Sequence, residues 1–145
     1  MRYWLFKSEP GAWSWADQVA AGDGGAEWDG VRSAQACNNM KAMAVGDLGL
    51  FYHSVREKRI VGVVTVSQPY GPDPADATGR FGMVWVRAVA AAPSPVTLAQ
   101  VRADPALADL PLVRQARLSV MPVPEAAWAR LCGMAGLGPD GRPPA

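Results

Sequence analysis

The chain has 145 residues, half of them hydrophobic and 19% charged, and its 14 basic and 13 acidic side chains leave a formal charge of +1. This length predicts one domain, and the hydrophobic fraction excludes an intrinsically disordered chain. The near-zero charge excludes a whole-protein field that would draw the chain onto nucleic acid or anionic lipid, so any polynucleotide contact must use a local patch.

The first residues predict a strand followed by a capped helix. Residues 2–6 contain an aromatic run and form the expected strand, with three polar residues at its end, Lys7, Ser8 and Glu9. Ser14 and Asp17 have capping-box spacing, which predicts a helix that ends near Ala21. Trp13 and Trp15 are expected to pack against that helix.

Residues 28–54 combine residue types that suit a concave site for a flat, polar ligand. Trp28 is expected in a loop at the mouth of such a site, near Arg32 and the amides Gln35, Asn38 and Asn39. A tryptophan in this context can equally be a core plug, and paired asparagines can be helix caps, so both interpretations stay open. A short helix over residues 35–43 and a strand over 48–53 complete the stretch.

The middle of the chain predicts a hairpin and a third long strand. A charged connection with Arg56, Lys58 and Arg59 leads into a β-branched strand over residues 60–66. The prolines of residues 69–79 predict a surface loop, and alternation over residues 81–89 predicts a strand that Pro93 ends.

The last third predicts short elements. Thr97 is the expected N-cap of one helix, and Pro105 is expected to begin another. Residues 117–120 alternate as a strand and residues 125–134 form a closing helix, while the Gly- and Pro-rich residues 136–145 predict a mobile tail. Short strands broken by helices, without βαβ repeats, favour an α+β mixed barrel.

Several classes of chemistry lack their motifs. Cys37 and Cys132 have no CxxC spacing, and a single histidine argues against a metal centre, so neither metal nor disulfides are expected. The glycine motifs for dinucleotides and nucleotide phosphates are absent, so we expect no cofactor. A nucleophilic set would need Cys37, Ser8 or Ser54 with His53 as its base, without a GxSxG elbow to support it. The chain has no signal-like leader and no apolar run of about 18 residues, which predicts a soluble, cytoplasmic protein without a membrane partner.

Five motifs in order carry a resemblance to a known family: YWLFKSEP, WDGVR followed by QA and NN, GDLGLFYHS, IVGVVTV with YGPDP, and RQARLSVMPV. Together they resemble the EVE domain of the PUA-like superfamily and, more distantly, the YTH readers of methylated adenine. The resemblance implies an α+β pseudo-β-barrel of about five to six strands flanked by short helices, with residues 1–135 as one domain. It also implies a pocket that binds a modified base flipped from DNA or RNA.

The expected site residues follow from those motifs and from the amide-rich segment between them. The expected base-binding residues are Lys7, Ser8, Glu9, Trp28, Arg32, Ser33, Gln35, Asn38, Tyr52, His53, Ser54, Arg117 and Ser119. Phosphate contacts are expected from Arg56, Lys58 and Arg59. EVE domains usually have Asn, Tyr and Arg where this chain has Ser33, Ala34 and Cys37, and these departures are expected to change ligand choice rather than the fold.

Three functional hypotheses follow. The first is a non-enzymatic reader of a methylated or hydroxymethylated base in nucleic acid. The second is an enzyme or enzyme subunit that acts on a modified base through Glu9 and His53. The third is a module that recruits a nuclease or another effector protein.

Overall fold

Six strands form one curved, mixed sheet in a computed structural model that describes residues 1–144. The sheet order is β2-β5-β4-β3-β1-β6. The strands are β1 (Tyr3–Ser8), β2 (Ala26–Trp28), β3 (Leu48–His53), β4 (Arg59–Pro72), β5 (Gly82–Thr97) and β6 (Val120–Val123). The strand number agrees with the expected five to six.

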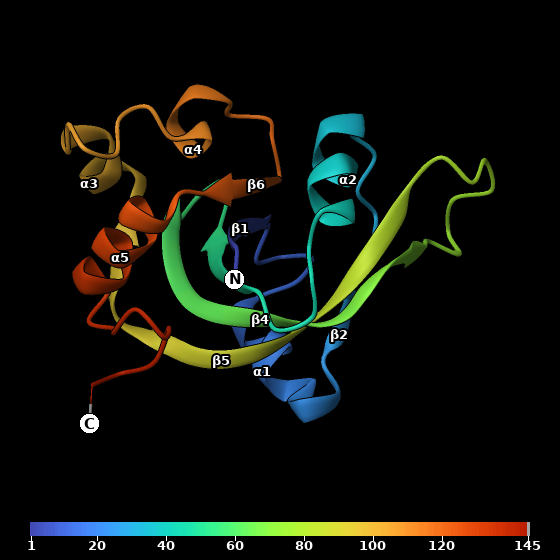
Figure 1. Ribbon diagram of the computed structural model, residues 1–145, viewed down its shortest axis with the longest axis horizontal. Helices are drawn as coiled ribbons and strands as arrows, with labels where there is room; N and C mark the ends of the chain where they lie inside the picture. The colour runs from blue at the N-terminus through green and yellow to red at the C-terminus, as the bar shows by residue number, and fades with distance from the viewer. Residues whose placement is uncertain (145) are drawn as a thin grey trace.

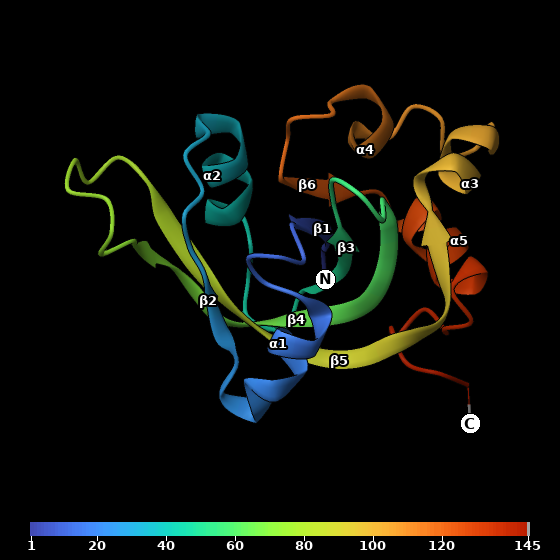
Figure 2. The same cartoon turned by 180° about the vertical axis from the view of Figure 1, so that it is seen from behind.

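Short helices surround this sheet (Figures 1 and 2). They are α1 (Trp15–Ala20), α2 (Ala34–Lys41), α3 (Leu98–Ala103), α4 (Pro111–Arg114) and α5 (Glu125–Met134), with a 3-10 turn over Gly22–Gly24. The Ser14–Asp17 capping box and the Thr97 N-cap are present as expected. No helix within residues 1–144 has the length and apolar character needed to cross a membrane.

Strand β1, next to the edge strand β6, joins two kinds of pairing. It runs parallel to β3 and antiparallel to β6, while β3 and β4 form the expected antiparallel hairpin. The long strands β4 and β5 curve through the molecule and carry the sheet around its core (Figure 1). The edge strands β2 and β6 are not paired with each other, so the barrel stays open.

A close approach between neighbouring strands sets the centre of the core. Phe6 and Phe51 are fully buried, and a Cβ on Gly49 would lie 2.5 Å from the Phe6 ring. Only glycine therefore lets the Phe6 ring lie flat over β3 at this position. The GDLGLFYHS motif thereby positions the ring on which Trp28 packs.

Two strands continue past the prolines that were expected to end them. Strand β4 continues to Pro72 and β5 continues through Pro93 to Thr97. The pairing of β4 with β5 shifts register between Gln68 and Gly71 and again between Ile60 and Gly62. Such irregularities tolerate residues that cannot donate to the ladder, which is why the proline rule failed here.

Two further expectations on the elements were wrong. Pro105 begins turns rather than a helix, and the helix begins instead at Pro111. The last strand starts at Val120 rather than at Arg117, and it continues through Pro122, opposite Trp4, to Val123 because an edge position tolerates proline.

The C-terminal segment contacts the body of the protein. Leu137 is buried, and Trp128 Nε1 donates a hydrogen bond of 2.9 Å to the carbonyl of Pro139. The backbone of Gly141 lies against Val63, since a Cβ there would meet that side chain at 2.8 Å. The mobility expected for residues 136–145 stays a prediction, and Ala145 lies outside the described residues.

Candidate functional site

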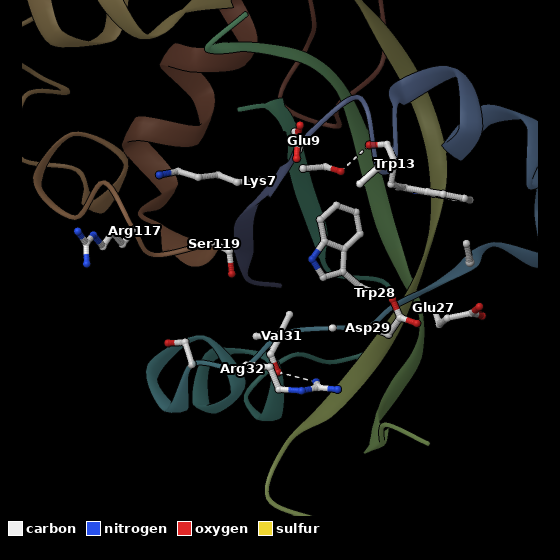
Figure 3. Close-up of a pocket in the computed structure, with 15 residues that line it drawn as sticks. Lys7, Glu9, Trp13, Glu27, Trp28, Asp29, Val31, Arg32, Arg117 and Ser119 are labelled. Carbon is white, nitrogen blue, oxygen red and sulfur yellow. Dashed lines mark hydrogen bonds between the residues drawn. The ribbon is translucent and has the colours of Figure 1, made fainter. Parts of the chain in front are cut away.

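A cavity of about 650 Å³ opens between the end of β1, the end of β2 and the segment that precedes β6 (Figure 3). This volume lies within the range of small-molecule pockets. The lining residues are Lys7, Ser8, Glu9, Ala12, Trp13, Ala26, Glu27, Trp28, Asp29, Gly30, Val31, Arg32, Ser33, Arg117 and Ser119. The cavity thus gathers residues from the YWLFKSEP, WDGVR and RLS motifs.

Trp28 is the central aromatic residue of this cavity, but it does not lie in the expected loop. It is the last residue of β2 and is only 7% exposed. Its ring meets Phe6 at 5.1 Å and 67° and Phe51 at 5.6 Å and 88°, both edge-to-face arrangements. The sequence left two interpretations of Trp28 open, a residue packed in the core or a residue at a binding site. In the structure the same side chain packs in the core and lines the cavity.

The indole nitrogen of Trp28 remains available to a ligand. Within residues 1–144 no group accepts a hydrogen bond from Nε1, and this atom is not a buried, unpaired polar atom. In Figure 3 the nitrogen lies on the Ser119 side of the ring. Trp28 therefore offers an N–H donor into the cavity from a ring that packs against Phe6 and Phe51.

The turn after β2 is held by a buried carboxylate. Gly30 has φ 74°, a conformation that favours glycine, and its N–H donates to Asp73 Oδ2 at 3.0 Å. Arg32 Nη1 donates to the same oxygen at 3.0 Å and to the Val31 carbonyl. The Gly30 N–H, followed by the Arg32 guanidinium and the Ala75 N–H, holds the pKa of Asp73 below its usual value.

The opposite wall is fixed by a relay of hydrogen bonds. Ser8 Oγ donates to the Trp13 carbonyl, and Trp13 Nε1 donates to Gln18 Oε1 at 3.0 Å. Gln18 is fully buried, and its Nε2 donates to the Val86 carbonyl at 3.0 Å. Trp13, expected as a packing residue, is thus a rigid part of the cavity wall.

Charges of both signs line the cavity in equal number. The cations are Lys7, Arg32 and Arg117, and the carboxylates are Glu9, Glu27 and Asp29. Lys7 extends away from the indole, and its Nζ donates to the Ala116 carbonyl at 3.0 Å (Figure 3). Burial lowers the pKa of Lys7. A balanced lining of this kind suits an uncharged polar ligand better than a phosphate.

Two smaller grooves adjoin the cavity. One, of about 330 Å³, shares Ser33 and Arg117 with it and adds Gln35 and Gln115. The other, of about 310 Å³, shares Glu9 and is lined further by residues 54–57 of the β3–β4 turn. The site can therefore hold an extended ligand on both sides of its central cavity.

Five expected base-binding residues do not line the cavity. Gln35 and Ser54 line the adjoining grooves, Asn38 is exposed on α2, and Tyr52 is buried. Both ring nitrogens of His53 are engaged. Its Nε2 accepts the Trp15 N–H at 3.0 Å, and its Nδ1 lies 3.0 Å from Glu57 Oε1. This arrangement makes Nδ1 the protonated nitrogen and leaves no free lone pair on the ring.

The expected phosphate contacts lie in and beside the β3–β4 turn. Arg56, Lys58 and Arg59 are all exposed, and Arg59 Nε pairs with Glu57 at 2.9 Å. The hydrogen bond from His53 and then that from Arg59 lower the pKa of Glu57. Within the described chain, Arg56 and Lys58 have no side-chain ion pair and remain available for other anions.

Two of the three departures from the family pattern, Ser33 and Cys37, have separate structural roles. Ser33 is the N-cap of α2, where its Oγ accepts the Ala36 N–H at 3.3 Å. Cys37 is buried, and its Sγ contacts the Val31 carbonyl at 3.8 Å, beneath the cavity lining.

The expected site did not include Trp13, Glu27, Asp29, Val31 or the supporting Asp73. The YGPDP motif was the available signal for Asp73. Residues 1–144 contain no cluster of acidic, His or Cys side chains suited to a metal ion.

Comparisons with known proteins agree on one family. The model of the EVE domain matches residues 2–134. Protein Atu2648 from Agrobacterium tumefaciens is 46% identical, with a TM-score of 0.93 and full coverage of both chains. The crystal structure of human THYN1 in complex with DNA containing 5-methylcytosine is 27% identical, with a TM-score of 0.84 over 93% of this chain and 98% of that one.

Two further comparisons set limits. Chicken thymocyte nuclear protein 1 is 37% identical over 81 residues, which cover 49% of this chain and 34% of that protein. The chain therefore spans about a third of the length of that curated relative. The YTH domain of Zygosaccharomyces rouxii MRB1 is 15% identical with a TM-score of 0.55 over 92% of this chain and 86% of that one, a likeness of fold alone. These findings confirm the expected α+β PUA-like fold.

Proposed function

This chain belongs to the EVE domain family, and on that premise we propose that it is a non-enzymatic domain that reads a modified base in nucleic acid. The observation that carries the proposal is the cavity beside Trp28, which combines an aromatic wall, an unpaired N–H donor and a balanced charge. Support comes from human THYN1, whose structure contains 5-methylcytosine DNA and matches this fold along nearly all of the chain.

The cavity has the chemistry to hold a flipped base. A base carries donors and acceptors around a flat ring, and the Trp28 N–H, the Ser119 hydroxyl and the Glu9 carboxylate supply complementary groups. Contact with an aromatic residue contributes about 1–3 kcal/mol per base. We infer that discrimination between bases comes from this cavity.

Phosphates would bind at the rim rather than inside the cavity. Arg117 lines both the cavity and one adjoining groove, and within residues 1–144 its guanidinium has no ion pair. Arg56 lines the other groove. Cations on the two sides of a neutral pocket suit a backbone that crosses the site while one base enters it.

The enzymatic alternative receives less support. Of its two residues Glu9 lines the cavity, but His53 does not, and the ring nitrogens of His53 are already engaged by Trp15 and Glu57. A domain that binds without catalysis fits the third hypothesis, in which an effector protein acts on the bound nucleic acid. That partner stays a proposal.

The test is a set of binding titrations by fluorescence anisotropy. Oligonucleotides with cytosine, 5-methylcytosine or 5-hydroxymethylcytosine would be compared as single strands and as duplexes. Matching RNA strands with and without N6-methyladenine would extend the set. We expect one modification to bind tighter than its unmodified form by a factor on the order of 5 to 150.

The matched variants are Arg117→Ala and Arg142→Ala, which remove an exposed arginine at the cavity and near the C-terminus. Arg117→Ala should weaken binding to every oligonucleotide to a similar degree, because a phosphate contact carries no sequence information. Arg142→Ala should leave binding unchanged. Equal affinity of the natural protein for all versions would refute the proposed function.

A further inference from the structure

The β3–β4 turn, residues 54–58, displays an exposed valine in an unfavourable backbone conformation. Val55 has φ 70° and is 61% exposed. Positive φ is strained for a β-branched residue, because its side chain crowds the backbone. Within residues 1–144, the other non-glycine residue with positive φ is Lys58, in the same turn.

Hydrogen bonds hold this turn in place. The Ser54 N–H donates to the Ser8 carbonyl at 2.9 Å, and the Leu98 N–H donates to the Lys58 carbonyl at 2.8 Å. Glu57 accepts from Arg59 and lies against His53. Strain persists only where surroundings impose it, and functional sites are where such strain is commonly retained.

The turn lies at the edge of the candidate site. Val55 lines the groove that shares Glu9 with the central cavity, and Ser8, to which the turn is bonded, lines the cavity itself. Arg56 and Lys58 follow Val55 in the same turn, and both are exposed. The turn thus offers one apolar side chain together with two cations, next to the cavity entrance.

This combination fits a DNA duplex in which one base has left the base stack. A base that leaves the helix opens a gap, and an apolar side chain that fills the gap stabilises the opened form. Cations in the same turn suit the phosphates of the neighbouring nucleotides. A side chain already held outward loses little conformational freedom on binding.

We propose that Val55 is a wedge that enters the base stack of a DNA duplex when the recognised base occupies the cavity beside Trp28. The inference rests on the proposed function and adds to it a duplex substrate and a residue that favours base extrusion. A single strand has no stack of this kind to fill, so the wedge should matter for duplexes alone.

The experiment compares two exposed valines. Val55→Ala and Val45→Ala remove the same atoms, from side chains that are 61% and 59% exposed, and Val45 lies in the connection between α2 and β3. Val55→Gly removes the whole side chain, and glycine adopts positive φ without steric penalty, so this variant should fold with an unchanged or raised Tm.

The probes are a short DNA duplex with a single 5-methylcytosine and the same modified strand alone. We expect Val55→Ala and Val55→Gly to weaken duplex binding about tenfold and to leave single-strand binding within about twofold. Val45→Ala should match the natural protein on both probes. A 2-aminopurine beside the modified base should brighten with the natural protein and brighten less with Val55→Gly.

Three results would overturn the wedge. In the first, both Val55 variants bind the duplex with the affinity of the natural protein. In the second, they lose affinity equally for the duplex and the single strand. In the third, the natural protein does not prefer the methylated duplex. If the natural protein still prefers any modified oligonucleotide, as a single strand or a duplex, the proposed function stands and only the wedge fails. If it binds every modified oligonucleotide no more tightly than the unmodified form, both fail.

Discussion

Asp73 accepts a hydrogen bond from Arg32 Nη1 at 3.0 Å, although 41 residues separate the two in the chain. The Asp73 side chain is 1% exposed and that of Arg32 is 39% exposed, so a buried carboxylate holds a cavity-lining cation. The same carboxylate accepts the N–H of Gly30. The loop after β4 thereby fixes the turn that follows Trp28.

Loss of this carboxylate should loosen the cavity wall. We expect Asp73→Ala to lower the free energy of unfolding by about 1–3 kcal/mol, because the N–H groups of Gly30 and Ala75 and the Arg32 guanidinium lose their shared, buried acceptor. Urea denaturation measures this loss. Asp23→Ala, which removes an exposed carboxylate from the 3-10 turn, is the control and should change stability little. A small effect of Asp73→Ala would show that the turn holds its shape without the clamp.

The same carboxylate predicts a dependence of stability on pH. The folded-state pKa of Asp73 is depressed, so its contribution is present in full above the ordinary value of about 3.9 and is lost as the pH falls toward the folded-state pKa. Asp73→Asn should therefore be less stable than the natural protein at neutral pH, with a gap that narrows below about pH 4. Urea midpoints at a series of pH values measure the gap. A gap that stays constant with pH would contradict this assignment.

Trp28 should matter for both stability and binding. Because Trp28 is only 7% exposed, its truncation to alanine should cost about 3–5 kcal/mol and much of the stability of a small domain. Trp28→Phe keeps an aromatic ring in the core and should cost less, while it removes the N–H donor. We expect Trp28→Phe to fold and to bind the modified base about tenfold more weakly. Natural affinity in Trp28→Phe would show that the donor is not used.

His53 should act on stability rather than on chemistry. His53→Ala removes the acceptor of the Trp15 N–H, and we expect a loss of about 1–3 kcal/mol in thermal or urea unfolding. The folded fraction should bind the preferred oligonucleotide within about twofold of the natural protein. A well-folded His53→Ala that no longer binds would return His53 to the site, as the FYHS motif predicts.

Local signals in the sequence predicted several elements closely. The strand Leu48–His53 and the helix Glu125–Met134 have the expected bounds, and the Ser14 capping box lies where its spacing indicated. Each depends on residues a few positions apart. The longer course of β4 and β5 depends instead on how two strands pair across their bulges, which proline positions alone do not determine.

The same distinction between local signals and long-range contacts applies to the candidate site. Lys7, Trp28 and Ser119 come from three separate motifs and line one cavity, while their role in binding a base stays a prediction. The direction of neighbouring side chains was harder to foresee, because successive residues of a strand face opposite sides, and His53 points to α1 rather than to the cavity. The role of Asp73 could be recognised only in the folded structure, because its partner Arg32 lies in another motif.

The indole N–H signal of Trp28 in an NMR spectrum tests the central claim most directly. The protein has six tryptophans, and the signal that disappears in Trp28→Phe identifies the one from Trp28. The proposed function predicts that this signal moves when the preferred modified oligonucleotide is added and stays in place with its unmodified counterpart. A Trp28 signal unmoved at saturation, while signals of the β3–β4 turn shift, would contradict a base bound in this cavity.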